Sequence, residues 1–131
     1  RTFVEPSDLR VLQATTSSEA IVLLHLHGDL PYLTDLAATY PAQALNWHDR
    51  RTRPSLAEAI GQVSQALVGG LDERGSMITA SPEAVRAQVH DAIAQCGGRR
   101  LLVGPGCVVD LRVPDANLAA ARQAVEDLPR P

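Results

Sequence analysis

The sequence contains no lysine, because all 12 of its basic residues are arginine. This absence excludes a lysine Schiff base and a lysine phosphate cradle within the chain. Aromatic residues make up only 3% of the 131 residues, so the core has to be built from Ala, Leu, Val and Ile. The net charge is -3 and both signs are interspersed, which leaves no basic patch of the kind that nucleic-acid binding requires.

Cysteines and long apolar runs are also scarce. The two cysteines, Cys96 and Cys107, are expected at the end of a helix and after the next strand, where a disulfide would have no structural purpose. We therefore expect free thiols and a cytoplasmic protein. No apolar run is long enough to cross a bilayer, and the first residues do not resemble a signal peptide. Because the chain begins with Arg1 and not with Met, we also expect a fragment of a longer protein.

Four short apolar runs alternate with helical patterns. Strands are expected at residues 20–26, 42–47, 66–71 and 100–103, and their continuous apolar character is typical of parallel strands buried on both faces. Helices are expected over residues 7–15, 30–39, 54–62, 82–96 and 115–128. The fourth of them is the best marked, with Ser81 as N-cap, Pro82 at the first position and Gly97-Gly98 beyond its end. This alternation predicts a single α/β domain, residues 1–131, of four βα units.

Two architectures accommodate four βα units. One is a small doubly wound open sheet, and the other is half of an eight-stranded (β/α) barrel, whose complete form needs roughly 250 residues. No dinucleotide fingerprint or phosphate loop follows any expected strand, since Gly69-Gly70 and Gly104-Pro105-Gly106 are too short for either. The sequence therefore disfavours a nucleotide-binding sheet.

Two histidines and one cysteine follow expected strands. His25 and His27 end the first strand two residues apart, so they point to the same face, and Cys107 follows the fourth strand. Chemistry in α/β folds gathers at this carboxyl edge of the sheet. Two nitrogens and one sulfur match the open three-ligand set of a catalytic zinc site, with a small-molecule substrate at the fourth position. The alternative is a chance pair of histidines and a cysteine that is a small buried hydrophobe.

A second cluster follows the second strand. His48 and Arg50 are expected to bind an anionic or carboxylated substrate, with Trp47 as a stacking wall. Asp72 is expected to point into the mouth of the barrel. The alternative is a solvated loop over a half-buried Trp47, with Asp72 as a turn former. Three carboxylates are expected as acceptors for the imidazole N–H groups of the site: Glu19, Asp29 and Asp49.

Five short segments lie in the order seen in one protein family. They are His25-Leu26-His27-Gly28-Asp29, Ala44-Leu45-Asn46-Trp47, Leu67-Val68-Gly69-Gly70-Leu71-Asp72, Gly104-Pro105-Gly106-Cys107 and Pro114-Asp115-Ala116-Asn117-Leu118. From about Phe3 to Leu128, the chain resembles the carboxyl-terminal half of the uroporphyrinogen decarboxylase family. The superfamily also includes cobalamin- and coenzyme M-dependent methyltransferases. The resemblance implies that the chain supplies the last four βα units of a (β/α)8 TIM barrel.

The two branches of this superfamily imply different chemistry. In the methyltransferase branch, a His-x-Cys pair and a Cys in a Gly-Cys turn bind zinc, and His25 and Cys107 match this pattern while His27 replaces the middle cysteine. Histidine is a competent zinc ligand. The resemblance thus implies zinc-dependent methyl transfer to a thiol, with a corrinoid as a possible methyl donor.

Two alternatives remain open. In true uroporphyrinogen decarboxylases a histidine stands at the position of Cys107, and an arginine-rich segment and an aspartate near the amino terminus hold the substrate; this chain has neither. A metal-free lyase of porphyrin biosynthesis, acting on a tetrapyrrole, would use His25 or His27 as general acid. The other alternative is a half-barrel that is inactive alone and pairs as a homodimer or with a separate N-terminal half, since it exposes two sheet edges.

Overall fold

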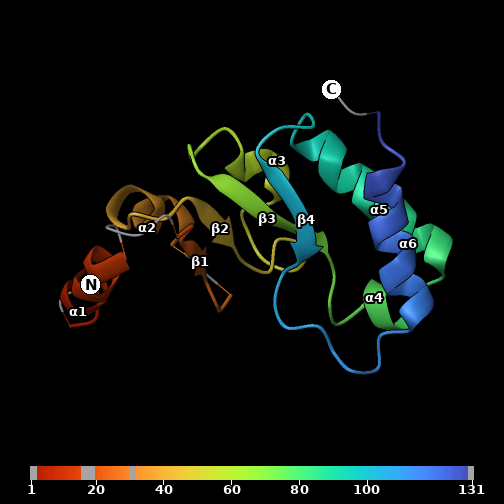
Figure 1. The fold of residues 1–131 in the computed structure, drawn as a ribbon, viewed down its shortest axis with the longest axis horizontal. Coiled ribbons are helices and arrows are strands. Elements are labelled where there is room, and N and C mark those ends of the chain that lie inside the picture. Colours follow the sequence, from red (N-terminus) through yellow and green to blue (C-terminus); the bar gives the residue numbers. More distant parts are fainter. Residues whose placement is uncertain (1–2, 16–19, 30–31, 130–131) are drawn as a thin grey trace.

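The protein is described by a computed structural model covering residues 3–15, 20–29 and 32–129. Four parallel strands form one sheet in the order β1-β2-β3-β4, which is also their order in the chain (Figure 1). The strands are β1 (Leu23–His25), β2 (Ala44–Asn46), β3 (Ala66–Leu71) and β4 (Leu101–Pro105). The helices are α1 (Glu5–Thr15), α2 (Leu33–Thr39), α3 (Leu56–Ala59), α4 (Ser76–Thr79), α5 (Pro82–Gln95) and α6 (Asp115–Glu126).

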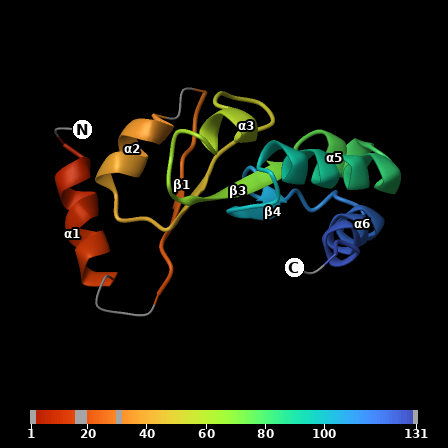
Figure 2. The ribbon, with the colours of Figure 1, turned by 90° about the horizontal axis from the view of Figure 1, so that it is seen from above.

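This strand order distinguishes between the two expected architectures. A doubly wound sheet reverses its strand order at a switch point and carries helices on both faces. Here each strand pairs with the next one in the chain, and α2, α3 and α5 lie on one side of the sheet (Figure 2). The winding is therefore that of a partial (β/α) barrel.

The register of the strands separates a covered face from an open face. The covered row packs in the core against the helices and consists of Leu24, Leu45, Leu67 and Leu101. The next row points to the other face and consists of His25, Asn46, Val68 and Leu102. Leu23 is 49% exposed and Leu102 is 55% exposed. The expectation of burial on both faces is thus wrong for β1 and β4, because helices cover only one side.

A second apolar cluster joins the carboxyl-terminal helices to the sheet. It contains Leu71, Met77, Val85, Val89, Val113, Ala121 and Ala124. The buried Asn117 of α6 donates both amide hydrogens to the backbone, to Met77 O at 2.9 Å and Ala80 O at 3.0 Å. This side chain therefore links α6 to α4 itself, through Met77, and to Ala80, the residue that directly follows α4.

Most element boundaries differ by a few residues from the sequence prediction. Ser81 caps α5 through the Ala84 N–H and Pro82 is its first residue, as expected. The helix expected over 54–62 is only the single turn α3, which begins at a capping box between Ser55 and Glu58. The short helix α4 was not expected. The predicted start of the second helix, residues 30–31, lies outside the described residues. Within the described part of the chain, no helix is long and apolar enough to span a membrane.

Candidate metal centre

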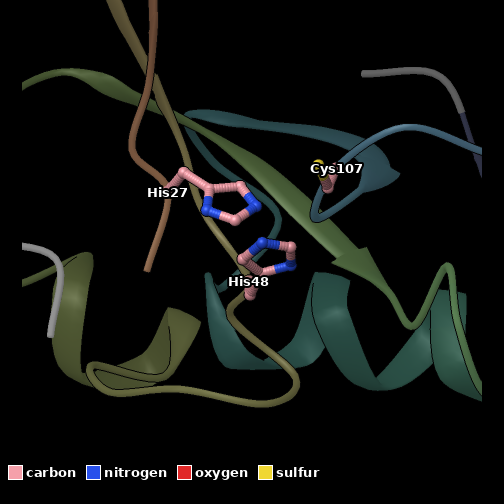
Figure 3. A group of neighbouring side chains, drawn as sticks. All are labelled: His27, His48 and Cys107. Atoms are coloured by element: carbon pink, nitrogen blue, oxygen red, sulfur yellow. The ribbon is translucent and has the colours of Figure 1, made fainter. Parts of the chain in front are cut away.

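Three potential metal ligands converge at the carboxyl edge of the sheet. His27 follows β1, His48 follows β2 and Cys107 follows β4, and one ligand atom from each lies within 4.8 Å of the others (Figure 3). In a flat sheet, β1 and β4 would lie about 14 Å apart, at three strand spacings. The loops after these strands therefore converge over the edge of the sheet and bring together residues 80 positions apart in the chain.

The donor set suits zinc. Imidazole nitrogen and thiolate sulfur bind zinc at about 2.0–2.3 Å, which places the ligand atoms of a tetrahedral site roughly 3.5 Å from one another. In the structure the ligand atoms lie within 4.8 Å of one another, so binding would bring them closer by up to about 1.3 Å. Three protein ligands would leave a fourth position for a substrate. The residues present thus fit a zinc ion of the catalytic type after a small closure of the side chains.

The structure assembles a different set from the predicted His25, His27 and Cys107. His27 and Cys107 come together, but the third member is His48, which the sequence had assigned to substrate binding. His25 remains close, with its ring centroid 6.0 Å from that of His27 and 6.1 Å from that of His48. Its Nδ1 is engaged by Asn46 Oδ1 at 2.6 Å. The register explains the exchange, because His25 pairs with Asn46 within the sheet, whereas His48 lies two residues beyond the end of β2.

A buried carboxylate anchors His48. Glu73, which follows β3, is 1% exposed and its Oε1 lies 2.9 Å from His48 Nδ1. Arg51 Nη1 approaches the same oxygen at 3.7 Å. Sequence reasoning missed Glu73, although it stands directly beside Asp72 at the end of an apolar strand.

Gly106 places the cysteine loop against His48. A side-chain carbon at this position would lie 2.9 Å from Trp47 O, 3.0 Å from His48 Cα and 3.1 Å from Glu73 Oε2. Only glycine permits this approach without a shift of the neighbouring atoms. The backbone next to Cys107 is therefore packed directly on the residues that hold His48.

Of the three carboxylates expected to support the imidazoles, Asp49 has a different partner. Both oxygens of Asp49 lie near the Gly70 N–H, at 3.0 and 3.2 Å. Asp49 is 7% exposed, and burial raises the pKa of its carboxyl from 3.8 to about 6. Asp29 is exposed, and Glu19 lies outside the described residues. The imidazole partners in the structure are Asn46 for His25 and Glu73 for His48.

The other residues predicted to bind substrate have structural contacts. Trp47 is completely buried and its Nε1 donates to Pro54 O, so it offers no stacking face. The Arg50 guanidinium donates to Gly70 O and Gln88 O and pairs with Asp91, which ties the loop after β2 to β3 and α5. Asp72 accepts the N–H groups of Arg74 and Gly75, as the turn interpretation predicted.

A small polar cavity adjoins the candidate metal ligands His27 and His48. Its volume is about 160 Å³, and His27 and His48 form part of its wall. Two arginines, Arg51 and Arg74, and one acidic residue, Asp29, line the same space. The cavity thus joins the candidate metal ligands to positive charge that suits an anionic group.

Comparisons with known proteins agree with this architecture. A methyltransferase from Methanosarcina mazei superposes with a TM-score of 0.77 at 21% sequence identity, over 97% of this chain and 36% of that chain. The chain thus has the fold of about one third of that protein, as expected for a partial barrel. No curated protein shows significant sequence similarity to it. The family model of uroporphyrinogen decarboxylase (URO-D) matches residues 1–128. The chain therefore belongs to the uroporphyrinogen decarboxylase family.

Proposed function

We propose that this chain carries the metal-binding part of a methyltransferase that methylates a thiol with the help of zinc. The observation that carries the proposal is the convergence of His27, His48 and Cys107, with ligand atoms within 4.8 Å of one another. Two nitrogens and one sulfur with an open position are typical of catalytic zinc. The fold shared with a methyltransferase from Methanosarcina mazei supports the reaction class.

Each residue has a defined task in this proposal. His27 and His48 supply neutral imidazole nitrogens, and Cys107 supplies a thiolate. Zinc, when bound, lowers the pKa of a coordinated thiol and so activates it as a nucleophile at neutral pH. A bond then forms between the acceptor sulfur and the methyl carbon, while the bond between the methyl carbon and the donor breaks. The electron pair of the broken bond stays on the donor, for which a corrinoid is the candidate, and the thiol proton leaves to solvent.

The adjoining cavity suggests which thiols fit. Arg51 and Arg74 lie beside the two imidazoles and provide hydrogen-bond donors for a carboxylate or another oxyanion. A volume of about 160 Å³ holds a small head group and not a large ring system. We therefore propose a short thiol with an anionic end as the methyl acceptor.

Zinc binding tests the proposal directly. The purified chain is titrated with zinc against a competing chelator, and we expect one equivalent to bind. His27→Ala, His48→Ala and Cys107→Ser should each weaken binding by more than about 100-fold, beyond the effect of losing a supporting residue. His90→Ala on the exposed side of α5 is the matched control and should bind like the wild type. His25→Ala distinguishes the two ligand sets. Zinc binding like that of the wild type would support His27, His48 and Cys107, whereas loss of binding would support the set that contains His25.

The same titration addresses the lyase alternative. Less than one-tenth of an equivalent of zinc in fresh protein, with no binding on titration, would contradict the zinc site and favour a metal-free decarboxylase-type lyase. In that case His27 and His48 would act on protons instead of holding a metal.

The chain spans only 36% of the methyltransferase that it resembles, so catalysis is a proposal for the whole protein. We propose that the free edges of β1 and β4 pair with further strands, from a second copy or from a separate N-terminal half. The exposed Leu23 and Leu102 on these strands support this pairing. Light scattering on the isolated chain should detect self-association. A soluble monomer would contradict pairing with a second copy and leave a separate N-terminal half as the partner. The free thiols of Cys96 and Cys107 favour a cytoplasmic location.

A further inference from the structure

The buried hydrogen bond between His48 and Glu73 indicates which ring nitrogen of His48 carries a hydrogen. A carboxylate oxygen accepts hydrogen bonds and has no proton to give, so the partner nitrogen at 2.9 Å must carry the hydrogen. Arg51 places positive charge 3.7 Å from the same oxygen, which stabilises the negative form. His48 therefore carries a hydrogen on Nδ1, and in the neutral imidazole the free lone pair lies on Nε2.

An amide does the same for His25. The Asn46 side chain donates from Nδ2 to two carbonyls, Val68 O at 2.8 Å and Pro105 O at 3.0 Å. These two bonds fix which end of the amide is oxygen, and that oxygen lies 2.6 Å from His25 Nδ1. An amide oxygen only accepts, so His25 Nδ1 must also carry a hydrogen. The neighbouring strands β3 and β4 thus determine the tautomer of an imidazole on β1.

We propose that Glu73 and Asn46 are positioning residues that hold the candidate ligand His48 and its neighbour His25 in the Nδ1–H tautomer before any metal arrives. Each imidazole then offers Nε2 as its only unprotonated nitrogen. A free histidine exchanges between both tautomers, and a ligand nitrogen that carries hydrogen cannot bind a metal. The two buried acceptors remove this competition and also fix the orientation of the rings.

The tautomers can be read without metal, by long-range proton–nitrogen correlation on histidine-labelled, chelator-treated protein at a pH where imidazoles are neutral. We expect the pyrrole-type nitrogen signal at Nδ1 and the pyridine-type signal at Nε2 for His25 and His48. His90, exposed on α5, provides the reference for a ring in solvent. The opposite assignment for His48 in the wild-type protein would overturn the inference for Glu73, whatever the variants do.

Two substitutions separate positioning from mere packing. Glu73→Gln keeps an acceptor oxygen and should retain the His48 tautomer, whereas Glu73→Met keeps the bulk, removes the acceptor and should let the hydrogen move to Nε2. Zinc affinity should fall by about 10- to 100-fold in Glu73→Met and by much less in Glu73→Gln. Equal zinc affinity and an unchanged tautomer in folded Glu73→Met would contradict the role of Glu73.

The zinc arm of this experiment rests on the proposed function, while the tautomer arm does not. If the tautomers are as expected and zinc fails to bind, the proposed function fails and the positioning role stands. If zinc binds and His48 carries its hydrogen on Nε2, the positioning role fails and the metal site stands.

Discussion

The buried carboxyl of Asp49 should make the stability of the chain depend on pH in an unusual direction. Burial raises its pKa from 3.8 to about 6, against the opposing effects of the Gly70 N–H and the Arg50 charge. A carboxyl that binds its proton more tightly in the folded chain stabilises the fold most below pH about 4. This stabilisation is lost as the pH rises through about 6. The difference of about two pH units corresponds to about 3 kcal/mol, at about 1.4 kcal/mol per unit.

Asp49→Asn removes this titration and nearly preserves the shape of the side chain. Its amide oxygen can still accept the Gly70 N–H, which Asp49 accepts at 3.0 Å. The variant should therefore gain stability relative to the wild type as the pH rises from 4.5 to 7, by about 2 kcal/mol of the full difference of about 3 kcal/mol. Below pH about 3 both proteins are neutral at this position in the folded and the unfolded state, and the pH-dependent advantage should vanish.

Urea unfolding of metal-free protein measures this difference. Trp47 is the single tryptophan of the sequence and is completely buried, so its fluorescence reports unfolding. Asp110→Asn is the matched control. Hydrogen bonds from Arg112 lower the pKa of the partly exposed Asp110 to about 2, so both its folded and its unfolded titrations lie below pH 4.5. A stability difference between wild type and Asp49→Asn that stays constant from pH 4.5 to 7 would refute the reasoning.

Three further predictions follow from buried contacts. Asn117→Ala leaves Met77 O and Ala80 O without their donor and should lower the free energy of unfolding by about 2–4 kcal/mol in urea unfolding; a change below 1 kcal/mol would contradict the role of this amide. Gly70→Ala should cost about 2–5 kcal/mol in the same assay, because φ is +103° and the added carbon meets Ala92; Gly61→Ala, with nothing within 4 Å, is its control. Iodoacetamide should alkylate Cys107 before the buried Cys96, whose pKa is raised by burial, and one equivalent of zinc should protect Cys107. Peptide mass spectrometry reports both sites, and faster modification of Cys96 would contradict this order.

The repeating architecture could be predicted because its signals are local. Apolar runs, the Ser81 cap, Pro82 at the helix start and Gly97-Gly98 beyond its end all lie within or beside the elements that they specify. The open face of the sheet could not be predicted in this way. Whether Leu102 is buried depends on which side the crossing helices cover, and Leu102 itself carries no sign of it.

The grouping of the candidate ligands could be predicted in part for a similar reason. Placing His27 and Cys107 at strand ends on the carboxyl edge required only the order of strands and loops. Choosing between His25 and His48 required the register, which pairs His25 with Asn46. Glu73 was overlooked because its partner lies 25 positions earlier in the sequence, on a different loop. Arg50 has the same property, since its acceptors on α5 lie about 40 positions away.

The sequential strand order has a consequence for the biosynthesis of the protein. His27 is made among the first of the described residues, while Cys107 follows after four strands have been completed. A nascent chain therefore cannot bring His27, His48 and Cys107 together until all four strands have left the ribosome. Copies that end before Cys107 would leave two imidazoles without their sulfur partner, and metal capture would select for chains that have been synthesised beyond β4.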